Sequence, residues 1–157
     1  MTTLHFTPAE RPTMQFQKQE FRHDPDNGIH GDCWRTAIAC VLGLNRDEVP
    51  HTHSAEPGEL SGTINGFIES RGLSLFSIYI DGSLSVREAL IEASKFQTHP
   101  FMFIGESRTG TNHVVIAQDG KIIHDPSQVD SGIIGPTIED GVYIAEWLIY
   151  HPARFSA

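Results

Sequence analysis

The sequence predicts one α+β domain in which helices come first and a mostly antiparallel sheet follows. Its length of 157 residues is that of a single domain with a core of ordinary size. Early in the chain apolar residues recur at the spacing of a helix face, and later they form short runs bounded by turn residues. This order of elements is typical of α+β folds. We expect the domain to span residues 1–157, with an irregular N-terminal arm over residues 1–30.

The first predicted helix begins at the cysteine that ends a Gly-Asp-Cys motif. Its apolar residues recur at the spacing of one helix face: Cys33, Ala37, Cys40, Val41 and Leu44. Asp32 stands where an N-cap is expected, and Gly43 lies near the predicted end. Similar patterns predict a short capped turn over 45–50 and two further helices over 60–71 and 85–96.

The strands are predicted from apolar runs between turn signals. Five are expected, over residues 73–80, 100–104, 113–118, 121–124 and 142–150. The dipeptide Asp119-Gly120 is a strong hairpin signal. The glycine-rich segment 127–141 is expected to be a loop. One more short strand is expected in the arm, around residues 14–21.

The composition excludes several classes of function. Eleven basic and twenty acidic residues give a formal net charge of −9, so neither nucleic acid nor an anionic membrane surface is an expected partner. The longest apolar run, residues 37–44, is too short to span a bilayer, and the first residues resemble no secretory signal. The two cysteines lie too far apart on one helix to form a disulfide. We therefore expect a cytoplasmic protein.

Three residues carry the expected chemistry. In the first turn of a helix the dipole favours the thiolate of Cys33, and the backbone N–H of that residue can face a developing oxyanion. Such a nucleophile needs a base, and His113, at the start of a strand, is the best candidate. The imidazole needs a partner that fixes its tautomer. Asp125, twelve residues later on the paired strand, suits that role.

These residues stand in motifs that resemble a known family. Gly31-Asp32-Cys33-Trp34 is similar to the start of the central helix in papain-like cysteine peptidases, and Asn112-His113-Val114-Val115 resembles their histidine strand. His124-Asp125-Pro126 looks most like the bacterial double-glycine leader peptidases. The resemblance implies a papain-like fold, with the cysteine at the N-terminus of a central helix packed on the sheet. It also implies a small phage or bacterial protein, located in the host cytoplasm if phage-encoded.

The first functional hypothesis is a papain-like cysteine hydrolase, namely a thiol protease, isopeptidase, amidase or acyltransferase. Cys33 would attack an acyl carbon of a peptide or protein substrate, His113 would take and return the proton, and Asp125 would orient His113. No cofactor is expected. The alternative is a catalytically silent papain-like binding protein, for example a phage protein that sequesters a host factor or a small signal molecule.

The resemblance also implies an amide side chain upstream of the cysteine that completes an oxyanion hole. Gln17 and Gln19 are the favoured candidates, on a segment that a loop must return to Cys33. Asn27 is the remaining candidate because it lies six residues before the cysteine. The choice among the three stays open at this point.

The role of Asp125 depends on the register of the hairpin. With a strict two-residue turn, Val115 pairs with His124, and Asp125 faces away from His113. A three-residue loop with a bulge would pair Val115 with Asp125 instead and bring the carboxylate to the face of His113. The triad therefore predicts an odd-length turn, or a strand that twists out at its end.

Zinc binding is the main alternative role for the histidines. His51 and His53 have a His-x-His spacing, and nine histidines are many for this length. The segment lies in a predicted loop beside prolines, and the chain has neither a His-Glu-x-x-His motif nor paired Cys-x-x-Cys motifs. We therefore expect no metal site.

Overall fold

The described part of the chain combines three α-helices with one five-stranded antiparallel sheet, which confirms the predicted α+β class. The computed structural model describes residues 13–56 and 58–150. The first twelve residues of the expected arm lie outside this part. Two short 3-10 helices, Pro25–Asn27 and Arg46–Glu48, stand on either side of the first α-helix.

The helices lie where the apolar patterns predict them. α1 comprises Cys33–Leu42 and ends slightly earlier than expected, because Gly43 adopts the left-handed conformation (φ 66°) that stops a helix. α2 comprises Glu59–Ser70. α3 comprises Val86–Ser94 and opens with the predicted capping box at Ser85. None of the helices in the described residues has the length and apolarity that crossing a membrane requires.

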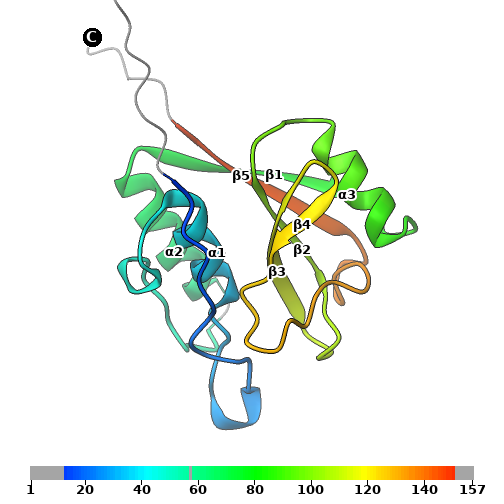
Figure 1. The fold of residues 1–157 in the computed structure, drawn as a ribbon. Coiled ribbons are helices and arrows are strands. Elements are labelled where there is room, and N and C mark those ends of the chain that lie inside the picture. The colour runs from blue at the N-terminus through cyan, green and yellow to red at the C-terminus, as the bar shows by residue number, and fades with distance from the viewer. Residues whose placement is uncertain (1–12, 57, 151–157) are drawn as a thin grey trace, which may run out of the picture.

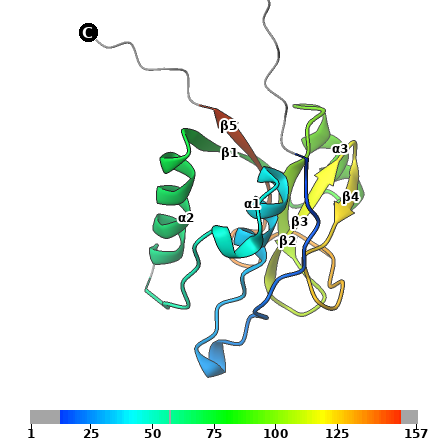
Figure 2. The ribbon, with the colours of Figure 1, turned by 60° about the vertical axis from the view of Figure 1, so that its left-hand side comes forward.

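The strands also occupy their predicted positions to within a few residues. They are β1 Leu73–Ile80, β2 Phe101–Glu106, β3 Asn112–Gln118, β4 Lys121–His124 and β5 Tyr143–Tyr150. Their order in the sheet is β1-β5-β2-β3-β4, and every neighbouring pair is antiparallel. α1 and α2 lie on one side of this sheet and α3 on the other (Figures 1 and 2).

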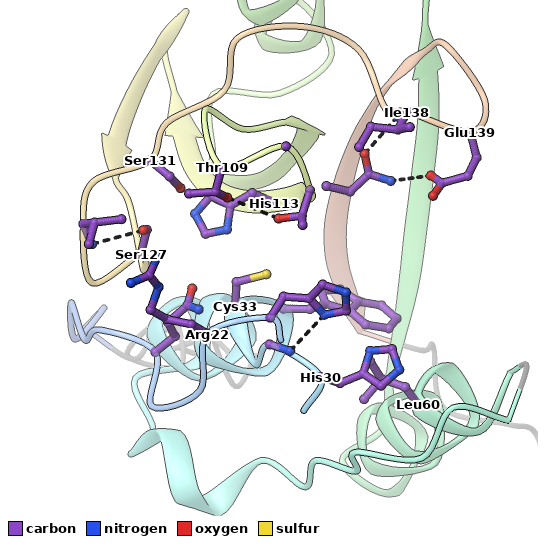
Figure 3. A pocket seen from close by; sticks show the side chains of 18 residues that line it. Arg22, His30, Cys33, Leu60, Thr109, His113, Ser127, Ser131, Ile138 and Glu139 are labelled. Atoms are coloured by element: carbon purple, nitrogen blue, oxygen red, sulfur yellow. Dashed lines mark hydrogen bonds between the residues drawn. The ribbon is translucent and has the colours of Figure 1, made fainter. Parts of the chain in front are cut away.

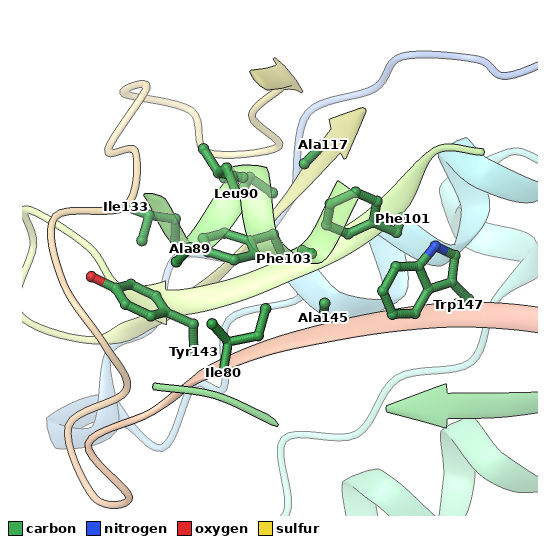
Figure 4. Close-up of a cluster of buried hydrophobic side chains, with 12 residues drawn as sticks. Ile80, Ala89, Leu90, Phe101, Phe103, Ala117, Ile133, Tyr143, Ala145 and Trp147 are labelled. Atoms are coloured by element: carbon green, nitrogen blue, oxygen red, sulfur yellow. The ribbon is translucent and has the colours of Figure 1, made fainter. Parts of the chain in front are cut away.

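Each face of the sheet has its own hydrophobic core. The core under α3 is drawn in Figure 4 and includes Ala89, Leu90, Phe101, Phe103, Tyr143 and Trp147. The core under α1 and α2 includes Ala37, Ile38, Cys40, Ile64, Met102 and Ile116. Neighbouring residues of β2 alternate between the two cores, as expected for a strand buried on both faces. The buried face of α1 thus fixes this helix against the sheet, close to β3.

The strand expected at residues 14–21 is not present. The segment makes separate contacts instead: the Gln15 N–H donates to the Cys40 carbonyl (3.2 Å), and the Gln19 N–H donates to the Pro126 carbonyl (2.7 Å). No ladder forms because the segment bonds to a helix on one side and to the loop after β4 on the other. This part of the arm therefore packs between α1 and the loop after β4.

Candidate active site

Cys33 opens α1 and reaches a pocket of about 640 Å³. The N–H groups in the first turn of a helix lack intrahelical acceptors and carry the positive end of the helix dipole, so they stabilise a thiolate at this position. Cys33 is partly exposed, whereas Cys40, two turns further along the same helix, is wholly buried. Both thiols are free. The helix therefore offers one accessible and one inaccessible thiol.

His113 lies near the start of β3 and is only 5% exposed. Its Nε2 is 2.6 Å from Oδ1 of Asp125. This bond leaves Nδ1 for Cys33, with whose side chain the imidazole has a favourable interaction. Figure 3 shows the sulfur of Cys33 and the ring of His113 on facing walls of one pocket. The structure thus brings together the three residues that the motifs indicated.

The surroundings of His113 favour its charged form. Burial acts against the imidazolium, but the hydrogen bond to Asp125 and the interaction with Cys33 outweigh burial and raise the pKa of His113 to about 9. The imidazole is therefore protonated at neutral pH. A protonated imidazole beside a thiol stabilises the thiolate, which is the nucleophilic form of sulfur.

Asp125 is held by backbone donors as well as by His113. The N–H of Ser127 donates to Oδ1 (2.8 Å), and the N–H of Gly132 donates to Oδ2 (2.8 Å). Burial acts against its charge, but the bonds from His113, Ser127 and Gly132 lower the pKa of Asp125 to about 2. Asp125 is therefore a fixed anion, oriented by the loop that follows β4.

The odd-length turn that the triad predicted is wrong. Gln118 pairs with Lys121, so the turn consists of Asp119 and Gly120 alone. Both residues have positive φ (51° and 74°), which is the conformation of a tight two-residue hairpin turn. The register at the turn is thus the strict one, which would direct Asp125 away from the histidine.

A bulge further along the hairpin supplies the shift. Two successive pairs of the ladder are offset by one residue: Ala117 with Ile122, and Ile116 with His124. β4 therefore contains one residue more than β3 at this point, and the offset changes which face the later residues occupy. Continued past the end of β4, this register brings Asp125 to the face of β3 that carries His113.

Among the three candidate amides, only Gln19 lines the pocket with Cys33. Its side chain is 8% exposed, and its Nε2 donates to the Phe21 carbonyl (2.7 Å). An amide nitrogen carries two hydrogens, so this bond leaves one of them for another acceptor. Oε1 of Gln19 is buried without a hydrogen-bond partner. Gln19 is thus the one of the three candidate amides that the fold places in the pocket of Cys33.

Gln17 and Asn27 lie outside the pocket, and neither has the position that an oxyanion hole needs. Gln17 binds the turn after α1, where its Nε2 donates to the Leu44 carbonyl (2.7 Å) and its Oε1 accepts from the Arg46 N–H (2.8 Å). Asn27 is exposed and donates to the Asp24 carboxylate (2.7 Å). Both side chains therefore serve local turns.

Asp32 has a role that the sequence did not indicate. It stands at the N-cap position, but its side chain makes no capping bond. Its fully buried carboxylate accepts from the N–H groups of Phe21 (2.8 Å) and Glu20 (3.3 Å) and from Nε of Arg35 (2.9 Å). These bonds hold residues 20 and 21 of the arm against the start of α1. The available signal was the spacing of three between Asp32 and Arg35, which a helix brings together.

Trp34 lines the pocket, and its indole N–H binds a buried carboxyl group whose role the sequence did not indicate. Its Nε1 donates to Oε2 of Glu146 on β5 (3.0 Å). Burial raises the pKa of Glu146 to about 7, although hydrogen bonds from Trp34 and Ser77 act in the opposite direction. The available signal was a single acidic residue inside the apolar run of the last strand.

His51 and His53 lie in the loop before α2 and hold another segment in place. Their rings meet edge to face, with centroids 4.9 Å apart. Nδ1 of His53 accepts from the His30 N–H (3.2 Å), and Nε2 of His51 bonds to the His30 carbonyl (3.0 Å). Within the part of the chain that the structure describes, no group of three or more potential ligands is arranged to hold a metal ion.

The pocket extends on both sides of the Cys33 sulfur. Figure 3 shows Arg22 and Ser127 at one end, and Leu60, Ile138 and Glu139 at the other. Polar and apolar side chains both contribute to its walls, and a basic and an acidic group mark opposite ends. The sulfur therefore lies between two ends of the pocket that differ in character.

No known family model, curated protein or solved structure matches this chain.

Proposed function

We propose that this chain is a papain-like cysteine hydrolase in which Cys33 is the nucleophile and His113 the acid and base. One observation carries the proposal: a single imidazole bonds to the Asp125 carboxylate and interacts with the Cys33 side chain beside a pocket. A papain-like fold is supported by a helix that begins at the cysteine and packs against an antiparallel sheet bearing the histidine.

The first step transfers an acyl group to sulfur. The Cys33 thiolate attacks the carbonyl carbon of an amide or ester, a C–S bond forms, and the C=O electron pair moves to oxygen. The backbone N–H of Cys33 and the Gln19 amide are the donors for this oxyanion. When the intermediate collapses, the C–N or C–O bond breaks, and the leaving group takes a proton from His113. A thioester remains on the enzyme.

The second step releases the acyl group. Neutral His113 removes a proton from water while the water oxygen attacks the thioester carbonyl. The C–S bond breaks, the carboxylic acid product leaves, and the Cys33 thiolate is restored beside the imidazolium. If an amine replaces water, the same proton path gives acyl transfer. Asp125 stays ionised in both steps, because its pKa of about 2 lies far below neutral pH.

The lining of the pocket supports a peptide-like substrate. Val129 and Ile138 are half-exposed aliphatic side chains in the loop between β4 and β5, and both border the pocket. Exposed apolar groups beside a nucleophile favour contact with substrate side chains. Subsites on both sides of the sulfur suit a chain that continues past the bond to be cleaved.

The reactivity of the thiol is the first test. We expect iodoacetamide at about pH 6 to alkylate Cys33 about 10- to 100-fold faster than an ordinary thiol, because the neighbouring His113 imidazole activates the nucleophile. His113→Ala removes this advantage. Cys40 on the same helix is the matched control, since burial raises the pKa of its thiol. The Cys40→Ser variant should keep the fast reaction, and Cys33→Ser should lose it.

Formation of an acyl-enzyme is the second test. A mixture of fluorogenic peptides and p-nitrophenyl acetate should yield an acyl-enzyme, detected by intact mass and mapped to Cys33. If Cys33 reacts as an ordinary thiol, independently of His113, and forms no thioester, the hydrolase proposal is wrong. That result would favour the alternative, a catalytically silent papain-like binding protein.

A further inference from the structure

We propose that Asp32 is a positioning residue that presents the Gln19 amide to the oxyanion formed at Cys33. The inference rests on the proposed function, since it concerns how the same site stabilises its intermediate. Gln19 precedes Cys33 by fourteen residues. This separation is too long for short-range contacts to bring the two residues together. A tertiary contact must therefore hold the amide in the pocket that Cys33 also lines.

The contact is a reciprocal pair of hydrogen bonds between Phe21 and Asp32. The Phe21 N–H donates to Oδ1 of Asp32 (2.8 Å), and the Asp32 N–H donates to the Phe21 carbonyl (3.3 Å). The residues between them form a closed excursion, because Asp24 and Ile29 exchange two backbone hydrogen bonds of 2.9 Å. The long spacing in sequence thus becomes a short connection in space, with Gln19 two residues before the junction.

The orientation of the Gln19 side chain depends on the same junction. Its Nε2 donates to the Phe21 carbonyl, the group that also accepts from the Asp32 N–H. The Gln19 backbone is held by Pro126 on its N–H side (2.7 Å) and by the Gln128 amide on its carbonyl side (3.0 Å). These bonds place the backbone of the residue, and the Phe21 carbonyl, shared with the Asp32 N–H, connects its amide to the first turn of α1.

A carboxylate is the group suited to this position. Asp32 is fully buried and accepts from two backbone N–H groups and from Nε of Arg35 (2.9 Å). An ionised carboxylate is an acceptor only, so it satisfies all three donors at once. An asparagine would direct its own NH₂ group at one of these donors and disturb the junction. The Asp32→Asn variant therefore tests position with little change of volume.

Two reactions of Cys33 separate positioning from nucleophile strength. Alkylation by iodoacetamide forms a C–S bond at a saturated carbon and expels iodide, so no oxyanion develops. Acylation by p-nitrophenyl acetate passes through a tetrahedral oxyanion and expels p-nitrophenolate. The ratio of the acylation rate constant to the alkylation rate constant therefore reports the oxyanion hole. We expect Gln19→Ala and Asp32→Asn each to lower this ratio by about 10- to 100-fold.

The double variant gives the decisive comparison. If Asp32 acts through Gln19, Asp32→Asn lowers the ratio no further in the Gln19→Ala background. Additive losses, or equal losses in alkylation and acylation, overturn the inference. Asp47→Asn is the matched control and should leave the ratio unchanged, because Asp47 lies near Arg35 (3.8 Å) but its carboxylate makes no hydrogen bond to residues 19–21.

The Arg35→Lys variant and the His113 dependence of wild-type alkylation complete the test. If Asp32→Asn does not fold, Arg35→Lys replaces it: the charge is kept but the Nε–H bond to Asp32 is lost, and we expect a several-fold drop in the ratio. An unchanged ratio in folded Arg35→Lys would then contradict the inference. Failure of the proposed function has a different signature, since wild-type alkylation would then show no dependence on His113.

Discussion

Asp125 lies 2.6 Å from His113 because β4 contains one residue more than β3 at the bulge between them. The two-residue turn by itself would direct the carboxylate to the other face of the sheet. A single extra residue thus decides whether the imidazole has a charged partner.

Asp125→Asn is expected to lower the pKa of His113 from about 9 toward the 6.5 of an unperturbed imidazole, because the amide keeps the shape but not the charge. At about pH 8 the His113 ring beside Cys33 is then mostly neutral, and alkylation of Cys33 should slow about 10-fold. The pH profile of iodoacetamide labelling and an NMR titration of the ring measure this effect. Asp119→Asn, in the turn of the same hairpin, is the control, and an unchanged profile in Asp125→Asn contradicts the prediction.

The pair of His113 and Asp125 should also shape stability against pH. The raised pKa of His113 contributes stability that is complete below about 6.5 and is lost as pH rises through about 9. The lowered pKa of Asp125 contributes stability that is complete above about 3.8 and is lost as pH falls toward about 2. The pair therefore stabilises the fold most between about pH 3.8 and pH 6.5, by about 2–3 kcal/mol.

Urea unfolding of the wild type and of His113→Gln between about pH 4 and pH 10 tests this window. The difference in unfolding free energy should be largest near pH 5–6 and should shrink at alkaline pH. A difference that grows with pH would contradict the assigned direction.

Glu146→Gln is expected to stabilise the protein at alkaline pH. The pKa of Glu146 is raised by burial to about 7, so the folded state loses stability as pH rises from about 4.5 through about 7. Glutamine can still accept from Trp34 but has no charge to desolvate. The variant should exceed the wild type by up to about 3 kcal/mol at pH 8 and show little difference at pH 4. Denaturant midpoints at both values measure this, and equal midpoints at pH 8 would refute it.

The two glutamines of the arm should have separable effects. Gln17→Ala removes two hydrogen bonds at the turn after α1 and is expected to cost about 1–3 kcal/mol of stability. It should leave both reactions of Cys33 unchanged at a temperature where the variant is folded. Gln19→Ala should slow acylation instead. Thermal unfolding together with the two rate constants distinguishes them, and slow acylation in folded Gln17→Ala would reassign the oxyanion donor.

Much of the fold could be predicted because its elements depend on near neighbours. The apolar face that begins at Cys33, the stop at Gly43 and the capping box at Ser85 involve residues within a few positions of one another. The extended segment of the arm is the exception. Its backbone bonds to residues more than twenty positions away, and no short-range pattern encodes such partners.

The sequence by itself determined the elements, their order and three residues whose types suit one reaction: Cys33 at a helix start, His113 on a strand and Asp125 after its partner. Only the tertiary structure decided that a bulge turns Asp125 toward the histidine, that Gln19 is the candidate amide in the pocket of Cys33, and that Asp32 binds the backbone of Phe21 nearby. The physical reason is range. Periodicity and turn chemistry depend on a few consecutive residues, whereas strand register and buried polar contacts depend on which distant segments pack together.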